Sequence, residues 1–424
     1  MNQFTASLWG DEAFAAVLAQ KSYWQIILGV AKDTSPPLFY LSLHTWMKFF
    51  GINEIAIRAH SFLYFLLTVV VVYLIGKKLF DKKTGIIAAL LTFFNPFLFQ
   101  YGFEGRMYSI LAFYCVLSMY CFLTKRKVPY ILATAAALYS HHFAIFIVAV
   151  QLFLSLPNLR KNFYKIIQPF LYVALLYLPW FYPLYYQTSL VQSGFWLGKP
   201  GIKEVYHLLR NFLIGSFKHQ LQTKIFAVSL FSLALRRWRR KDFSLVVWFG
   251  LPIFLTFAVS HLKESIFFDR YMLFIIPALL LILASQRRRL SYPLLVLLIF
   301  GLAVMDFNYF VHPIKRPFRE LANFVKQIKE PGDYLINWSG GAHHLFESKY
   351  YQLEAPLYYP TGEPPFFIGT ALMNKNDIIK GLPQKERIGV ITSDSPESVY
   401  LPHFQLEKTY YFDDLKFIWF TKKH

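Results

Sequence analysis

The sequence is poor in charge and in cysteine. Charged residues make up 16% of the 424 residues, whereas an average soluble domain carries about 25%. The two cysteines, Cys115 and Cys121, fall in one apolar run, so neither a disulfide framework nor a cysteine metal site is indicated. Met1 is not followed by a basic region and an apolar core, so no cleaved signal peptide is expected. The abundant residues are hydrophobic (56%) and aromatic (19%), and this composition indicates an integral membrane protein.

The net charge of +20 is concentrated in five short basic clusters that lie between apolar runs. This arrangement is typical of cytoplasmic loops and does not suggest nucleic-acid binding. The clusters are Lys77-Lys78 with Lys82-Lys83, Lys125-Arg126-Lys127, Arg160-Lys161 with Lys165, the run 236–241 and Arg287-Arg288-Arg289.

About ten apolar runs alternate with these clusters, so we predict a multi-spanning α-helical membrane protein. A bilayer crossing needs roughly 20 apolar residues, and several of the runs are shorter than that. The alternation puts every basic cluster on the cytoplasmic side and the charged, aromatic-flanked motifs on the other side. The runs are residues 55–75, 85–100, 107–123, 128–139, 143–156, 166–186, 224–235, 243–262, 272–284 and 291–310.

The predicted spans divide the chain into three regions. Residues 1–53 are predicted to form an extracytoplasmic first loop with short interfacial helices, and residues 54–310 the transmembrane helical domain. Residues 311–424 are more polar and are predicted to form a small extracytoplasmic α/β domain. Its elements are a helix over 318–329, strands over 333–338 and 387–392, and a hairpin over 408–420 that turns at Asp413-Asp414.

The first candidate site is the carboxylate pair Asp11-Glu12, which follows Leu8-Trp9-Gly10. A carboxylate pair near a hydrocarbon phase is costly unless it is paired or faces water, so it indicates a functional site. Acidic residues that open a helix after glycine are also ordinary capping residues. The residue pattern alone leaves both interpretations open.

The other candidates on the predicted outer face each have a structural alternative. Asp33 precedes Ser35-Pro36-Pro37 and could be a turn residue, and Arg58 could be an interfacial anchor. Glu104 and Arg106 could pair with each other, and Arg270 could pair with Asp269. His141 and His142, at a helix break, could serve aromatic packing or substrate contact. A metal site would need a third ligand, which the spacing does not identify.

Five motifs in order resemble those of bacterial C-type (GT-C) glycosyltransferases, and the most similar group is family 39, the protein-mannosyltransferase-like enzymes. The resemblance extends over essentially the whole chain. The motifs are Trp9-Gly10-Asp11-Glu12, Asp33-x-x-Pro36-Pro37-Leu38-Phe39-Tyr40, Arg58-x-x-Ser61, Phe103-Glu104-Gly105-Arg106-Met107-Tyr108 and Arg270-Tyr271-x-x-Phe274-x-x-Pro277.

The resemblance implies a hexosyl- or pentosyltransferase with a polyprenyl-phosphate sugar as donor and the hydroxyl of a protein, lipid or glycan as acceptor. It implies that Asp11 is the catalytic base and that Glu12 supports it. The positive charge of Arg58, Arg106 and Arg270 suits binding of the donor phosphate. The expected substrate contacts are Asp33, Glu104, His141, His142 and Tyr271. A divalent metal is left open as a cofactor, and the expected location is the cell membrane.

Two departures from the family pattern matter. Relatives usually have a membrane helix before the Asp-Glu motif, but only ten residues precede Asp11 here, so the start is either unusual or called too short. Ser35 stands before Pro36 where many relatives have histidine, which weakens a metal or acceptor role for this turn. Two other interpretations therefore stay open: a lipid-linked glycan binding or transport protein without transferase activity, and an inactive, truncated relative.

Overall fold

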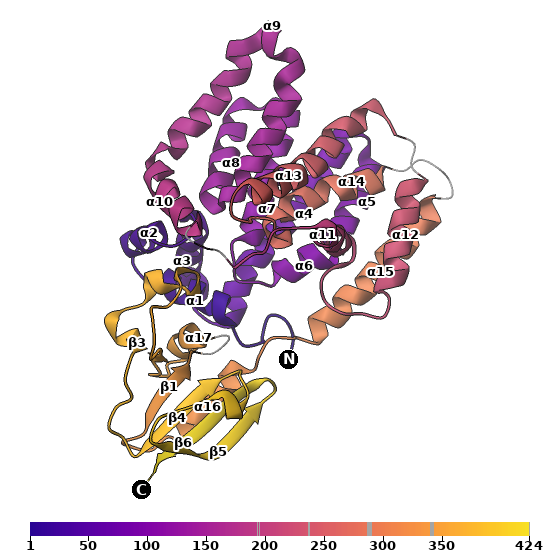
Figure 1. The fold of residues 1–424 in the computed structure, drawn as a ribbon. Coiled ribbons are helices and arrows are strands. Elements are labelled where there is room, and N and C mark those ends of the chain that lie inside the picture. Colours follow the sequence, from indigo (N-terminus) through magenta and orange to yellow (C-terminus); the bar gives the residue numbers. More distant parts are fainter. Residues whose placement is uncertain (193, 195, 236–237, 286–290, 340–342, 424) are drawn as a thin grey trace. The chain divides into compact units, whose positions relative to one another are not determined.

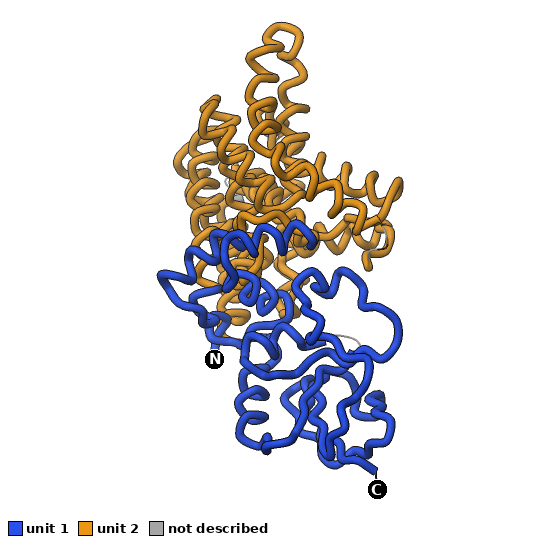
Figure 2. The backbone as a smooth tube through the Cα atoms, turned by 90° about the vertical axis from the view of Figure 1, so that its left-hand side faces the viewer, with its two compact units in different colours: residues 1–33, 40–57, 312–424 blue, residues 34–39, 58–311 orange. Residues whose placement is uncertain are grey.

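The structure is a computed structural model that describes residues 1–192, 194, 196–235, 238–285, 291–339 and 343–423. One predicted basic cluster, Arg287-Arg288-Arg289, and part of another, Arg236-Arg237, lie outside these residues. The chain forms two compact units, and each is built from separate stretches of sequence (Figure 2). Unit 1 comprises residues 1–33, 40–57 and 312–424, and unit 2 comprises residues 34–39 and 58–311. The N-terminal segment and the C-terminal region thus belong to the same unit.

Unit 2 is helical (Figure 1). Most of its elements coincide with the predicted apolar runs, because such runs satisfy their backbone hydrogen bonds internally only as helices. Its main helices are α4 (Glu54–Leu79, which starts in unit 1), α5 (Lys82–Phe93), α6 (Pro96–Gly102), α7 (Tyr108–Leu123), α8 (Lys127–Ser140), α9 (Ile145–Tyr177), α10 (Phe181–Gln192), α11 (Ile202–Ile214), α12 (Gln222–Ala234), α13 (Phe243–Leu262), α14 (Ile276–Ala284) and α15 (Ser291–Val311).

The predicted number of about ten spans is not supported. Within the described residues, four helical stretches are long and apolar enough to cross a membrane, or five if α5 and α6 count as one bent span. Those two helices meet at 61° where Asn95 caps α6 and Pro96 opens it. Helices α7, α8, α12 and α14 contain 16, 14, 13 and 9 residues, fewer than the roughly 20 that a crossing requires.

One of the four stretches, residues 142–192, contains both of the runs predicted at 143–156 and 166–186. Helix α9 is interrupted at Asn162, whose backbone is not helical (φ −137°, ψ 39°). Figure 1 shows α9 rising to this bend and returning. The bend falls in the predicted basic cluster with Arg160, Lys161 and Lys165, so the chain reverses where the charges interrupt the apolar run.

Unit 1 begins with short helices, which the sequence predicts within residues 1–53. They are α1 (Gly10–Ala19), α2 (Tyr23–Ala31) and α3 (Leu38–Phe50, whose first two residues belong to unit 2). Ser22 starts α2 with a capping box, because its hydroxyl accepts from the backbone N–H of Gln25 while the Gln25 side chain accepts from the backbone of Ser22. His44 of α3 bonds the carbonyl of Ala19 through Nδ1 (2.7 Å), which ties α3 to the end of α1.

The C-terminal part of unit 1 contains a six-stranded sheet in the order β3-β2-β1-β4-β6-β5. The first four strands in this order run parallel, and β6 and β5 add an antiparallel hairpin. The predicted hairpin turn at Asp413-Asp414 is confirmed. The elements are α16 (Phe318–Ile328), β1 (Tyr334–Trp338), α17 (Leu345–Tyr350), β2 (Leu357–Tyr358), β3 (Ile378–Ile379), β4 (Arg387–Thr392), β5 (Phe404–Phe412) and β6 (Leu415–Lys422).

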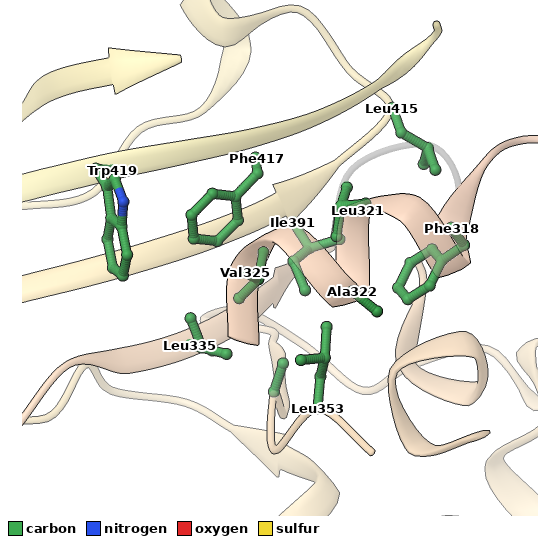
Figure 3. Close-up of a cluster of buried hydrophobic side chains, with 11 residues drawn as sticks. Phe318, Leu321, Ala322, Val325, Leu335, Leu353, Ile391, Leu415, Phe417 and Trp419 are labelled. Carbon is green, nitrogen blue, oxygen red and sulfur yellow. The ribbon is translucent and has the colours of Figure 1, made fainter. Parts of the chain in front are cut away.

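Apolar side chains cover both faces of this sheet, because successive residues of a strand point to opposite faces. On β6, Phe417 and Trp419 join the cluster that packs against α16, while Ile418 and Phe420 join the cluster on the other face. Figure 3 shows Leu321 and Val325 of α16 within the first cluster. The predicted α/β layer is therefore confirmed.

Candidate functional site

The carboxylate pair opens α1, with both acids in the first turn. The N-cap residue is Trp9, which makes no side-chain cap bond, so neither Asp11 nor Glu12 occupies the capping position itself. Asp11 is half-buried, whereas Glu12 is fully buried. Glu12 Oε1 lies 2.8 Å from Nζ of Lys315, which is itself 11% exposed. Glu12 therefore forms a buried ion pair within unit 1, and this partner was not predicted from the sequence.

Asp33 lies just after α2, in the turn that the proline pair predicts. Its backbone N–H donates to the carbonyl of Val30 (3.1 Å), and its side chain is half-buried. Like Asp11 and Glu12, it belongs to unit 1, whereas the remaining predicted site residues belong to unit 2.

Unit 2 contains a cavity of about 260 Å³ that collects several predicted site residues. They come from three separate segments: the loop before α7, the break after α8 and the 3-10 helix η4 (Asp269–Ile275). The polar lining includes Arg106, Tyr108, His141, His142, Gln187 and Tyr271. Phe143, Phe146, Ile145 and Leu184 add apolar walls. One cavity therefore combines a cation, two imidazoles, two phenols and an apolar wall.

Arg106 lies in the tight loop between α6 and α7. Its backbone N–H donates to the Glu104 carbonyl (2.7 Å), and its own carbonyl accepts from Ser61 Oγ of α4 (3.4 Å). Glu104 is 7% exposed. These contacts fix the Arg106 backbone at the cavity edge, because they anchor the loop on both sides of the residue.

Arg270 is surrounded by aromatic rings. Its guanidinium carbon lies 4.6 Å from the ring centre of Phe268, 5.4 Å from that of Tyr108 and 5.8 Å from that of Tyr271. Cation–π contacts of this kind hold a guanidinium in a fixed orientation. Two of the rings, Tyr108 and Tyr271, line the cavity. The rings therefore hold Arg270 next to the cavity wall.

Asp269, the alternative partner of Arg270, accepts two hydrogen bonds. Asn211 Nδ2 donates to its Oδ2 (2.8 Å), and the backbone N–H of Arg270 donates to its Oδ1 (2.7 Å). Asp269 thus ties η4 to α11, and this role for Asn211 could not be inferred from sequence spacing.

The two adjacent histidines have different surroundings. His142 contacts Tyr177 Oη through Nδ1 (3.2 Å) and Gln187 Oε1 through Nε2 (2.7 Å). Gln187 in turn donates to the carbonyl of Ser35 (3.3 Å). Both ring nitrogens of His142 are therefore engaged in holding α9, α10 and the turn at Ser35 together, which favours the packing interpretation for this residue.

His141 lies between α8 and the candidate span that starts at His142. Its Nδ1 accepts from the backbone N–H of Phe143 (3.1 Å), and its ring lies 5.0 Å from that of Tyr271. Burial lowers the pKa of His141 well below its usual value, and electrostatic interaction with the neighbouring His142, Arg106 and Arg270 lowers this pKa further. His141 is consequently neutral near pH 7.

Arg58 of α4 is fully buried within the protein. An interfacial anchor keeps its charged end in water or among headgroups, so burial argues against the anchor interpretation. A buried guanidinium needs compensating polar partners. Among the described residues, no group of three or more His, Cys, Asp or Glu side chains could hold a metal ion.

Comparison with known proteins supports the resemblance that the motifs predicted. Residues 34–186, less than half of the chain, match the family model described as dolichyl-phosphate-mannose-protein mannosyltransferase. No curated protein matches the chain. The apo crystal structure of ArnT from Cupriavidus metallidurans has the same fold, with a TM-score of 0.66 at 12% identity over 99% of this chain and 94% of that one.

The ArnT structure bound to undecaprenyl phosphate matches with a TM-score of 0.64 at 11% identity and the same coverage. The Archaeoglobus fulgidus oligosaccharyltransferase, in complex with Zn and sulfate, has a TM-score of 0.46 at 16% identity, over 76% of this chain and 56% of that one. The family-model match supports a likeness to the mannosyltransferase family over residues 34–186, and the ArnT structures show that the whole chain has the ArnT fold. The chain thus resembles the protein-mannosyltransferase-like group of C-type glycosyltransferases, and the predicted multi-pass membrane protein is supported.

Proposed function

We propose that this protein transfers a sugar from a polyprenyl-phosphate-linked donor to an acceptor hydroxyl on the outer face of the membrane. The observation that carries this proposal is the unit 2 cavity, where Arg106, His141 and the Arg270-bearing aromatic cluster meet an apolar wall. Guanidinium groups bind phosphate bidentately, and an apolar wall suits a prenyl chain. The matching fold of an ArnT structure bound to undecaprenyl phosphate supports the same donor class.

In the proposed reaction, Asp11 takes the proton of the acceptor hydroxyl. The acceptor oxygen attacks the anomeric carbon, and the bond from this carbon to the phosphate oxygen breaks. The polyprenyl phosphate leaves with the negative charge, which Arg106 and Arg270 stabilise. A single displacement with one base and no second nucleophile inverts the configuration of the sugar. A general base of this kind contributes about 10²- to 10⁴-fold in rate.

We assign Glu12 a supporting role, since its ion pair with Lys315 anchors the turn that carries Asp11. Arg58 is proposed to contribute to phosphate binding. Asp33, Glu104, His141 and Tyr271 are proposed substrate contacts, whereas His142 is proposed to act through the geometry of its neighbours.

The experiment is transfer from a panel of radiolabelled polyprenyl-phosphate sugars in membranes that contain the full chain. Asp11→Asn should lose transfer and keep binding of the donor. Asp413→Asn is the matched control, because Asp413 occupies an exposed turn with positive φ (53°) that asparagine also adopts. Full activity of Asp11→Asn would remove Asp11 from the role of base.

One observation favours a second candidate, a lipid-linked glycan binding or transport protein. Asp306 is 2% exposed within α15, one of the candidate spans, and buried carboxylates in membrane helices often mark transport pathways. The same panel separates the two functions: a transporter would bind the donor without forming product, and would do so equally in the Asp11→Asn variant.

A further inference from the structure

A buried carboxylate of the C-terminal region lies against the start of α1. Glu347, the third residue of α17, is 4% exposed, although most glutamates are solvent-exposed. None of the sequence motifs includes this residue. Burial of a carboxylate is costly unless its contacts compensate for the lost hydration, so the surroundings of Glu347 call for a specific explanation.

The carboxylate of Glu347 lies next to Gly10, the first residue of α1. Its Oε1 and Oε2 lie 3.6 and 3.7 Å from the position that a Cβ atom would occupy on Gly10. Asp11 is the next residue, and the N-cap Trp9 supplies no side-chain cap. The N-terminus of a helix carries a positive partial charge, so a carboxylate at this end stabilises the first turn.

His344 also contacts the carboxylate of Glu347. Its Nδ1 lies 3.1 Å from Glu347 Oε1, and its side chain is 1% exposed. Since both side chains are buried, the orientation of Glu347 is restricted on the side of α17 as well as on the side of α1.

Contacts on either side of Gly10 fix the same helix to the C-terminal region. The backbone N–H of Leu8 donates to Tyr351 Oη (2.9 Å), and Tyr351 Oη donates to Glu54 Oε1 (2.9 Å). The ring of Phe14 packs edge-to-face on that of Phe346, with a centre-to-centre distance of 5.0 Å. Residues 346–351 therefore contact the chain before, at and after the turn that carries Asp11.

We propose that Glu347 is a positioning residue for Asp11, with His344 fixing the Glu347 carboxylate. This inference rests on the proposed role of Asp11 as base. In this view the C-terminal region serves the reaction by orienting the first turn of α1. Misplacement of a reacting group by about 1 Å costs about 10²-fold in rate, so even a small rotation of this turn has a large effect.

The test compares Glu347→Gln with the wild-type full chain in membranes, using the donor that the wild type accepts. Glutamine keeps the size of the side chain and removes its charge. We expect kcat to fall about 10- to 100-fold, whereas the affinity for undecaprenyl phosphate stays unchanged. Glu347→Asp, which keeps the charge, should recover part of kcat. The matched control is Glu363→Gln, since the Glu363 side chain is 87% exposed.

A second comparison separates positioning from general destabilisation. In the Asp11→Asn background, Glu347→Gln should cause no further loss of the residual rate, because the group that it positions is already gone. If Glu347→Gln does not fold, as judged by thermal unfolding, His344→Gln is used with the same expectations. A wild-type kcat in the folded Glu347→Gln variant would overturn the inference. So would an equal fold-loss of rate from Glu347→Gln in the wild-type and Asp11→Asn backgrounds. Absence of transfer by the wild type would instead contradict the proposed function.

Discussion

At the scale of single residues, the environment of Arg270 indicates what a conservative change would do. Arg270→Lys keeps the charge but loses the planar fork and its stacking on Phe268 and Tyr108. We expect the dissociation constant for undecaprenyl phosphate to rise about tenfold, which equals about 1.4 kcal/mol. Lipid-binding measurements on purified protein provide the check.

The control for this variant is Arg316→Lys, because Arg316 forms an exposed pair with Asp414 in the C-terminal region. An unchanged affinity in Arg270→Lys would contradict the assignment of Arg270 to the donor phosphate.

The neutral state of His141 has a consequence for stability at low pH. Burial and the neighbouring positive charges lower the pKa of His141 in the folded protein, while the unfolded chain keeps a value near 6.5. The unfolded state therefore binds more protons as the pH falls below about 6.5, and this favours unfolding. Thermal unfolding of the wild type should lose stability between about pH 6.5 and pH 5, and His141→Gln should lose less. Parallel curves of unfolding temperature against pH for the wild type and His141→Gln would contradict this prediction.

At the scale of elements, the Glu12–Lys315 pair links α1 to the segment before α16. Removal of one partner leaves a buried charge and typically costs about 3–5 kcal/mol, whereas removal of both costs much less. We expect Lys315→Met to lower the unfolding temperature strongly and Glu12→Gln with Lys315→Met to recover most of the loss. Thermal unfolding in detergent gives the unfolding temperatures of both variants. If the losses of the two single changes add up in the double variant, the two residues act independently.

The contact between α4 and α5 depends on two glycines. A Cβ atom on Gly76 would lie 2.7 Å from the Cα atom of Gly85, a backbone atom that cannot move aside locally. Small residues allow such close approach of membrane helices. Gly76→Ala should therefore destabilise the protein by about 1–3 kcal/mol. Gly250→Ala on α13 is the matched control, since no described atom lies within 4 Å of its Cβ position. Equal unfolding temperatures for Gly76→Ala and Gly250→Ala would contradict the expectation.

Helices and strands with strong periodic patterns could be predicted from the sequence. The strand 387–392 and the turn at Asp413-Asp414 agree with β4 and the β5–β6 hairpin, because alternation and turn residues are local signals. Strands β2 and β3 contain two residues each and carry no such signal. The number of spans was overestimated because apolar runs also form short helices such as α14 that are buried within the protein.

The candidate site could be predicted in part for the same reason. Arg106 and Tyr271 were identified from motifs and His141 from its position at a helix break, and all three line one cavity. Lys315, Gln187 and Glu347 were missed, since a charged or amide side chain in a polar stretch gives no indication that folding will bury it against a distant segment. Their burial depends on tertiary packing, which local sequence patterns do not encode.

At the scale of the whole molecule, the chain combines a helical membrane unit with a unit built from both ends of the sequence. The proposed base lies in unit 1 and the cavity in unit 2, so the proposed reaction requires both units. Within unit 1, the C-terminal region contacts the start of α1 directly, through the Leu8–Tyr351 hydrogen bond and the Glu12–Lys315 ion pair.

The most direct test of the account is the transfer assay with wild type and Asp11→Asn across the donor panel. We predict labelled, inverted product from the wild type alone, with undecaprenyl phosphate bound equally by both proteins. Product formed at the same rate by Asp11→Asn, or donor bound by both without any product, would contradict it.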